Sequence, residues 1–198
     1  MSKTRISITK LEKIVIIDFG SQFTQLIARK IRELGVYSEI INYNKVKNLK
    51  RNNFIKGIIL SGGPLTTTDK NAINLDNFIV HLNIPILGIC YGHQILAKKF
   101  GGKVKISKNR EFGLSIVKSK AKSPIIKNFF KKKTTRVWMS HQDVVYKIPK
   151  GFKQIASSEN SKFAIISNEK KKYFGIQFHP EVSHTINGKI LIGNFIFN

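Results

Sequence analysis

The sequence predicts an α/β protein with an open, mostly parallel, twisted sheet flanked by helices, and with a smaller β-rich second half. Over the first hundred residues, short apolar runs that close on Asp or Gly alternate with segments of helical periodicity. Such alternation indicates right-handed strand–helix–strand units and therefore a parallel sheet. Beyond Gly102 the pattern changes to short strand-like runs. The 198 residues, 41% of them hydrophobic, suffice for one domain with a core.

The first half is expected to contain four buried strands joined by helices. Ser21 is a candidate cap for the first helix, in which apolar residues recur at helical spacing until Gly35 ends it. Pro85 precedes the fourth strand. The expected strands are 13–20, 37–42, 56–61 and 86–90, and the expected helices are 23–34, 71–82 and 92–100.

The second half is expected to contain shorter strands and two further helices. Ser123 and Pro124 are expected to open a short helix, with serine as the cap and proline at the first position. Because no repeat or linker interrupts the chain, residues 13–198 are interpreted as one domain, preceded by a flexible extension at 1–12. The expected strands are 103–107, 113–119, 136–140, 154–158, 163–167 and 173–179, and an apolar helix is expected near 188–197.

Composition narrows the setting and the function. A single cysteine excludes an internal disulfide, and the basic residues 1–13 lack the apolar region of a secretory signal. No apolar run approaches the ~20 residues of a membrane span, so we expect a cytoplasmic protein without membrane contact. The net charge of +24 invites a nucleic-acid interpretation. The lysines are scattered and far outnumber the arginines, so we expect no specific nucleic-acid binding.

Cys90, the single cysteine, lies between an apolar run and a helical segment in the pattern G-x-C-x-G, which spans residues 88–92. This pattern is the thiol counterpart of a nucleophile elbow, where small residues permit a sharp turn from strand to helix. The helix N-terminus favours a thiolate, and the backbone N–H of Tyr91 would serve as an oxyanion donor. A lone cysteine is also commonly a core residue, so both interpretations stay open at this point.

A cysteine nucleophile needs a base, and the chain has five histidines. His81 is expected on the surface, and His93 beside the elbow as a supporting residue. His179 precedes Pro180, which favours an extended backbone and places Glu181 on the same side. The carboxylate would then orient the imidazole, although a strand-ending turn capped by Glu181 is an alternative.

The segment "SGGP", residues 61–64, follows another predicted strand. It can be a simple tight turn, or backbone without side chains that approaches a ligand. Gly62 and Gly63 are then candidate oxyanion donors. Since the carboxyl ends of neighbouring parallel strands meet at one crevice, this turn is expected to lie near Cys90.

The set "SGGP", "GICYGHQ" and "GIQFHPE" resembles the class I glutamine amidotransferases, the triad-type family with a flavodoxin-like fold. Within that family, "IIDFGSQFTQLIARKIRELGVYSEI", "NREFG", "VWMSHQD" and "FHPEVSHT" are similar to the glutaminase part of GMP synthetases. The resemblance extends from about Lys13 to the end of the sequence.

The resemblance implies a catalytic triad of Cys90, His179 and Glu181, with an oxyanion hole at Gly62, Gly63 and Tyr91. Cys90 would attack the carboxamide of L-glutamine, and the reaction would release glutamate and ammonia through a cysteinyl thioester. The resemblance places the remaining substrate contacts at Gln94, Ser140, His141 and Gln142. Gln142 replaces a small residue that is common after the "SH" of the family.

The resemblance also implies that ammonia serves the ATP-dependent amination of XMP to GMP. No glycine-rich nucleotide loop accompanies the glutaminase motifs, so ATP and Mg²⁺ are expected only in a partner ATP-pyrophosphatase domain or subunit. We expect no metal or cofactor in this chain, which would be a natural subunit or part of a fused enzyme. Alternatives are the amidotransferase of anthranilate, aminodeoxychorismate or carbamoyl phosphate synthesis. A different flavodoxin-like cysteine hydrolase and a noncatalytic basic module are disfavoured by the combined motifs.

Overall fold

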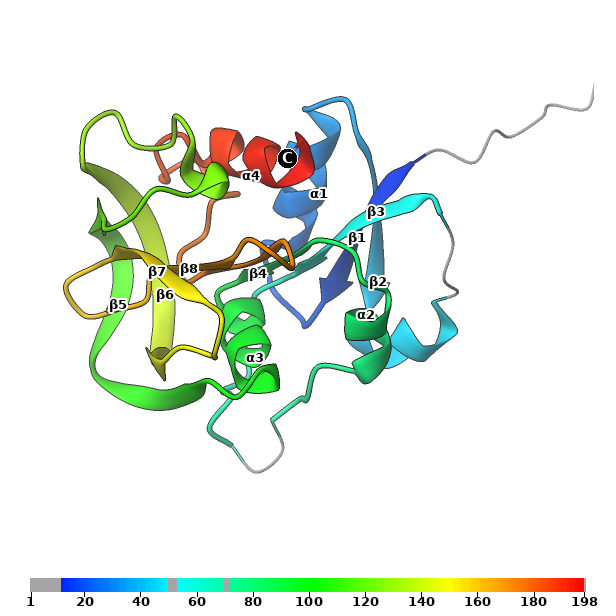
Figure 1. The fold of residues 1–198 in the computed structure, drawn as a ribbon, viewed down its shortest axis with the longest axis horizontal. Helices are drawn as coiled ribbons and strands as arrows, with labels where there is room; N and C mark the ends of the chain where they lie inside the picture. The colour runs from blue at the N-terminus through cyan, green and yellow to red at the C-terminus, as the bar shows by residue number, and fades with distance from the viewer. Residues whose placement is uncertain (1–11, 50–52, 70–71, 198) are drawn as a thin grey trace, which may run out of the picture.

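The computed structural model describes residues 12–49, 53–69 and 72–197, and Figure 1 shows their arrangement. Fifteen elements follow one another in this part of the chain. They are β1 Lys13–Asp18, α1 Thr24–Arg32, β2 Tyr37–Asn42, η1 Tyr43–Asn48, β3 Ile55–Leu60, α2 Asn77–His81, β4 Ile86–Ile89, α3 Tyr91–Lys99, β5 Lys103–Ser119, η2 Pro124–Ile126, β6 Thr134–Lys147, β7 Lys153–Ser157, β8 Ile165–Asn168, β9 Tyr173–Ile176 and α4 Gly188–Phe197.

One sheet of nine strands joins both halves of the chain, in the order β2-β1-β3-β4-β9-β8-β7-β5-β6. The strands from β2 to β9 in this order run parallel. The remaining pairs, β9 to β8 and onward to β6, are antiparallel. The predicted α/β class with a β-rich second half is therefore confirmed, and both halves share one sheet.

Helices cover both faces of the parallel part, as Figure 1 shows for α1 and α4 above the sheet and α2 and α3 below it. Successive residues of a strand point to opposite faces, and β1 illustrates the consequence. Ile14 and Ile16 pack in the core with α1 and α4. Val15 and Ile17 pack in a second core with α2 and α3. The continuous apolar run of β1 thus reflects burial on both sides.

Two local expectations from the sequence are wrong, and a third is confirmed in position only. Ser21 is not the cap of α1, because Phe23 holds that position and donates its N–H to Ser21 Oγ. Ser123 holds the cap position of η2 and Pro124 opens it, as expected, although the Ser123 side chain makes no capping bond. The helix expected at 71–82 is limited to α2, which begins after Asp76, whose Oδ1 accepts from the N–H of Phe78.

In the second half, β5 and β6 are longer than expected, whereas β8 and β9 are shorter. The segments expected at 103–107 and 113–119 form one strand, β5, which pairs with β6 along most of its length. A register irregularity between Ile106 and Glu111 absorbs the polar residues that interrupt the strand pattern. The expected extension 1–12 lies outside the described residues apart from Glu12, which forms an ion pair with Lys56 at 3.0 Å.

Gly92 allows α3 to begin against the end of β3, and we expect Gly92→Ala to destabilise the fold. A Cβ at this position would lie 2.2 Å from the backbone oxygen of Leu60, which a rotamer change cannot relieve. Overpacking of this kind costs about 1–3 kcal/mol, against a helix preference of alanine over glycine of roughly 1 kcal/mol, so a net destabilisation of up to about 2 kcal/mol is expected. Urea unfolding measures the change. Gly193→Ala in α4 is the control, because its nearest neighbour would be Leu34 at 3.8 Å; an equal unfolding midpoint for both variants would contradict the expectation.

Candidate active site

Cys90 stands at the junction of β4 and α3 in a backbone conformation that few L-residues adopt. Its φ is 52° and its ψ is −107°, and its N–H donates to the oxygen of Ile176 at 2.7 Å. The absence of a side chain at Gly88 allows the backbone of Gly92 to pass close to it, since a Cβ on Gly88 would lie 2.5 Å from the oxygen of Gly92. Strain of this kind is held by the surrounding structure and occurs at functional turns. The geometry is that of the nucleophile elbow that the sequence predicts.

His179 follows β9, next to the end of β4 in the sheet, and forms a close pair with Glu181. Its Nδ1 lies 2.7 Å from Oε1 of Glu181, and both side chains are buried. The backbone of His179 is fixed from two directions. Its N–H donates to the oxygen of Trp138 at 3.0 Å, and its oxygen accepts from Thr185 Oγ1 at 2.6 Å. The imidazole is therefore oriented by a carboxylate and held on a fixed backbone.

The charge state of His179 follows from its neighbours. Burial lowers the pKa of His179, but the carboxylate of Glu181 and the neighbouring sulfur of Cys90 together raise it to about 10. At neutral pH the ring is therefore protonated. A cationic imidazolium beside the sulfur stabilises the thiolate, which is the nucleophilic form of cysteine.

Gly62 and Gly63 lie at the end of β3, where the sequence places the oxyanion turn. A Cβ on Gly62 would lie 3.2 Å from His179 Cε1 and 3.7 Å from Cys90 Cβ, so the glycine lies next to both side chains. A Cβ on Gly63 would lie 2.7 Å from the oxygen of Phe19. Tyr91 is the first residue of α3, where a backbone N–H has no acceptor within its own helix. The predicted proximity of the turn to Cys90 is confirmed.

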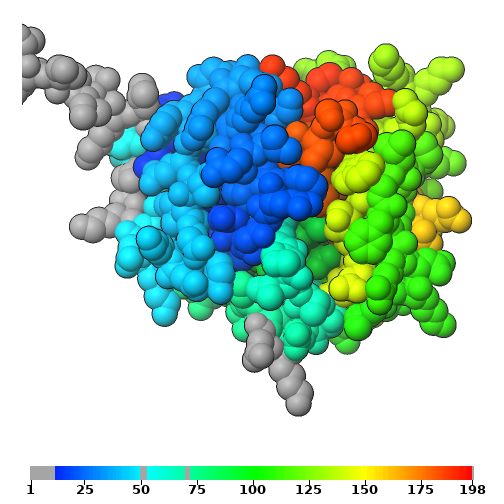
Figure 2. All heavy atoms as spheres, turned by 180° about the vertical axis from the view of Figure 1, so that it is seen from behind, coloured from blue at the N-terminus to red at the C-terminus, as the bar shows by residue number. Residues whose placement is uncertain are grey.

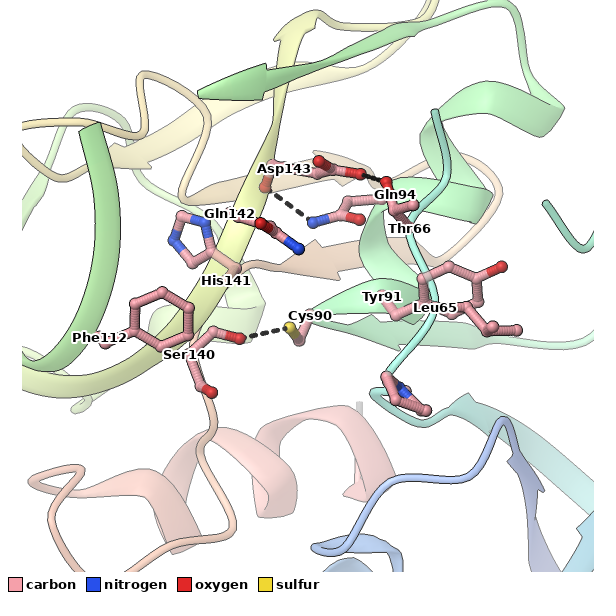
Figure 3. Close-up of a pocket in the computed structure, with 12 residues that line it drawn as sticks. Leu65, Thr66, Cys90, Tyr91, Gln94, Phe112, Ser140, His141, Gln142 and Asp143 are labelled. Carbon is pink, nitrogen blue, oxygen red and sulfur yellow. Dashed lines mark hydrogen bonds between the residues drawn. The ribbon is translucent and has the colours of Figure 1, made fainter. Parts of the chain in front are cut away.

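A cavity of about 200 Å³ opens beside the sulfur of Cys90 (Figure 3). It is bordered by most of the residues that the sequence assigns to the oxyanion hole and to substrate. The Sγ of Cys90 lies 3.5 Å from the oxygen of Ser140, and Gln94 Nε2 donates to the oxygen of Asp143 at 2.8 Å. The predicted residues on its wall are Gly63, Cys90, Tyr91, Gln94 and residues 140–142.

A second cavity, of about 290 Å³, reaches Cys90 from the other side. It is lined by His179 and by the loop between β1 and α1, which includes Ser21 and Phe23. The Phe23 ring packs edge-on against the His179 ring, with centroids 5.0 Å apart. Cys90 and Ser140 border both cavities, so the sulfur lies between them. Figure 2 shows this side of the molecule.

Two buried carboxylates on the cavity side were missed in the sequence. Glu111 lies 3.1 Å from His141 Nε2, and its oxygens accept from Ser115 Oγ at 3.1 Å and Ser158 Oγ at 3.0 Å. Burial raises the pKa of Glu111, but these hydrogen bonds outweigh it and lower the pKa below the ordinary value. The carboxylate is therefore ionised and holds the His141 ring.

Asp143, the second carboxylate, joins β6 to the loop after β3. Its Oδ2 accepts from the Thr66 hydroxyl and from the N–H of Thr67 at 3.1 Å. Within the described ranges its buried Oδ1 has no hydrogen-bond partner, and the residue borders the cavity. A buried acceptor without a partner at a cavity wall is suited to a ligand that carries donors.

The remaining histidines lie apart from this chemistry. His81 is exposed at the end of α2, as expected. His93 is buried against Gly175, and burial, together with His141, lowers its pKa to about 3, so it stays neutral.

Within residues 12–49, 53–69 and 72–197, no group of three His, Cys, Asp or Glu side chains could hold a metal ion. Over the same ranges, no helix is long and apolar enough to cross a membrane.

The fold and the arrangement of Cys90, His179 and Glu181 define an α/β protein of the cysteine–histidine–carboxylate type. Residues 15–198 match the model of the class-I glutamine amidotransferases. The chain belongs to this family, as its motifs predict.

Relatives within the family point to a particular group. The chain is 44% identical over 187 residues to a GMP synthase [glutamine-hydrolyzing] of Aliivibrio fischeri, covering 94% of this chain and 36% of that protein. Identity to the Chlorobium chlorochromatii GMP synthase is 46% over 194 residues, with 95% and 37% covered. The chain thus spans about a third of the length of these relatives. A crystal structure of a Thermoplasma acidophilum protein, assigned as one GMP synthase subunit, is also similar to this chain. The sequence identity is 32% and the TM-score is 0.81, and the match covers 94% of this chain and 92% of that one.

Proposed function

We propose that this chain hydrolyses L-glutamine to glutamate and ammonia, and that the ammonia serves the ATP-dependent amination of XMP to GMP by a synthetase part. The observation that carries this proposal is the position of Cys90, at a strained elbow between a substrate-sized cavity and the buried His179–Glu181 pair. The match to the class-I glutamine amidotransferases supports glutamine as the substrate.

In the first half of the reaction, the thiolate of Cys90 attacks the carboxamide carbon of glutamine. The developing oxyanion accepts hydrogen bonds from backbone N–H groups among Gly62, Gly63 and Tyr91. The tetrahedral intermediate collapses as the C–N bond breaks, and the imidazolium of His179 donates its proton to the departing nitrogen. The products are ammonia and a glutamyl thioester on Cys90.

In the second half, His179 is neutral and accepts a proton from water as the oxygen attacks the thioester carbon. The C–S bond breaks, glutamate leaves, and the thiolate of Cys90 and the imidazolium are restored. Glu181 stabilises the imidazolium and holds the ring, without contact to the substrate. Over the cycle, one water is consumed for each ammonia released.

The α-amino and α-carboxylate end of glutamine would lie along β6. Asp143 Oδ1 is a suitable acceptor for the α-ammonium group, because it is buried and free of protein donors within the described residues. His141, fixed by Glu111, borders the same cavity. Gln94, Ser140 and Gln142 complete the proposed contacts.

The acceptor reaction is proposed from the relatives. Those named GMP synthase are 44–46% identical, which favours XMP over the acceptors of the other amidotransferase groups. Because this chain spans about a third of their length, the ATP and Mg²⁺ chemistry is assigned to the synthetase part, whether that is a domain or a separate chain.

The test is to supply glutamine to the chain with and without the synthetase component of the same organism, in the presence of ATP, Mg²⁺ and XMP. We expect glutamate release in both mixtures, faster with the partner, and GMP only in the complete mixture. A mixture with ammonia in place of glutamine is the control that shows whether the synthetase component is active. If ammonia supports GMP formation but neither mixture releases glutamate, the proposed function is wrong.

Glu111→Gln is expected to raise KM for glutamine by about tenfold while kcat changes much less, because a charge-assisted hydrogen bond to His141 contributes roughly 1.5–3 kcal/mol. Glu111 contacts His141, which borders the cavity, and not the His179–Glu181 pair. Steady-state glutaminase kinetics measure the effect. Ser115→Ala is the matched control, since it removes one donor to Glu111 and keeps the carboxylate that holds the His141 ring. A parallel loss in kcat would show that Glu111 does not act through substrate binding.

A further inference from the structure

An apolar stripe on β5 lies exposed beside the active site. Phe112, Leu114 and Ile116 are 65%, 59% and 53% exposed, respectively. Being two residues apart on a strand, they point to the same face of the sheet. Large apolar side chains exposed in a row are a feature of interaction sites, whereas scattered ones are ordinary. We call these three side chains the β5 stripe.

The β5 stripe begins at the mouth of the substrate cavity. Phe112 borders that cavity, and Figure 3 shows its ring beside Ser140, on the side of Cys90 opposite Leu65. In the β5–β6 ladder Phe112 is directly opposite Ser140, whose oxygen lies 3.5 Å from the Sγ of Cys90. Leu114 is opposite Trp138, whose oxygen accepts from the N–H of His179. A partner bound to the β5 stripe would therefore lie next to β6, whose backbone oxygens contact both Cys90 and His179.

The surroundings of the stripe are basic. Lys108, Arg110, Lys118 and Arg136 are exposed around it on β5 and β6. Glu111, the carboxylate nearest in sequence, is buried and bound to His141. The chain as a whole has 35 basic and 11 acidic residues. A complementary surface is therefore apolar at its centre and acidic at its rim.

We propose that the β5 stripe is the docking surface for the ATP-dependent synthetase part, an inference that rests on the proposed function. Two findings favour this occupant over a second copy of the chain. The curated relatives carry about two thirds of their length outside the matched part, and the Thermoplasma acidophilum relative, matched over 92% of its length, is assigned as one subunit. Ammonia leaving Cys90 must reach that part, and the stripe continues from the cavity of Cys90.

The test is the double variant Leu114→Ser/Ile116→Ser, which leaves out Phe112 because Phe112 borders the cavity. Glutamate release by the variant chain alone is expected to equal that of the wild type. Its Kd for the synthetase component is expected to rise by about tenfold or more, and GMP formed per glutamate to fall accordingly. In the wild type, amide hydrogen exchange across residues 112–116 is expected to slow when the complex forms.

Tyr37→Ser/Phe197→Ser is the matched control. It also removes two exposed apolar side chains, 50% and 65% exposed, but Tyr37 lies on β2 at the opposite edge of the sheet. This variant is expected to bind the synthetase component like the wild type. Wild-type affinity of the β5 variant, or loss of a chain–chain dimer as its main effect, would overturn the proposal. Absence of glutamate release from the wild type would instead overturn the proposed function.

Discussion

Cys90→Ala is expected to abolish glutamate release, with a loss in kcat of about 10⁴-fold or more, the scale seen when a covalent nucleophile is removed. The chain has no second cysteine that could substitute. Because the alanine keeps the cavity and its polar walls, glutamine binding is expected to persist. Initial rates and calorimetric titration with glutamine measure the two quantities separately.

Folding of the Cys90→Ala variant is the necessary control. Alanine removes only the sulfur from a side chain that is 6% exposed, so the unfolding midpoint is expected to stay close to that of the wild type. Turnover by a folded Cys90→Ala chain at a rate near that of the wild type would contradict the assignment of Cys90 as the nucleophile.

His179→Ala is expected to lower kcat by about 10³-fold or more, because the leaving ammonia and the attacking water both lose their proton partner. Glu181→Gln is expected to bind glutamine normally and to react more slowly, since Glu181 acts through the ring of His179. Single-turnover measurements at saturating glutamine separate binding from chemistry. An unchanged rate in Glu181→Gln would reduce Glu181 to a residue that caps a turn.

The pH dependence of stability and of activity separates the role of His179 from that of Glu181. The pKa of His179 is raised from 6.5 to about 10, so the protonated ring stabilises the fold fully below 6.5, and this contribution is lost as pH rises through about 10. Wild-type activity is expected to decline in the same alkaline range, where the proton donor disappears. In Glu181→Gln the pKa of His179 falls, and the alkaline decline is expected at lower pH.

The sequence sufficed to predict the elements whose chemistry is local. The glycines around Cys90 predict an elbow because only small residues allow that turn, and β1 is recognisable because burial on both faces leaves a continuous apolar run. The His179–Glu181 pair follows from an extended backbone before Pro180. These features depend on residues close together in the chain.

Features that depend on distant parts of the chain were missed. Glu111 lies in a stretch of charged residues typical of a solvated strand, and its burial depends on Ser158 and His141, which other segments supply. Asp143 acquires its role from the loop that carries Thr66. The expected helix at 71–82 was overestimated because the capping of α2 by Asp76 outweighs the apolar periodicity upstream.

The most direct measurement of the proposed thioester chemistry is intact-mass and peptide mass spectrometry after exposure to diazo-oxo-norleucine, an electrophile that mimics glutamine. With one thiol in the chain, a single added mass on the peptide that contains Cys90 is expected, and glutamine is expected to protect that peptide in proportion to its saturation of the site. Labelling of Cys90 that is indifferent to glutamine, or labelling confined to other residues, would contradict the assignment of Cys90 as the glutaminase nucleophile.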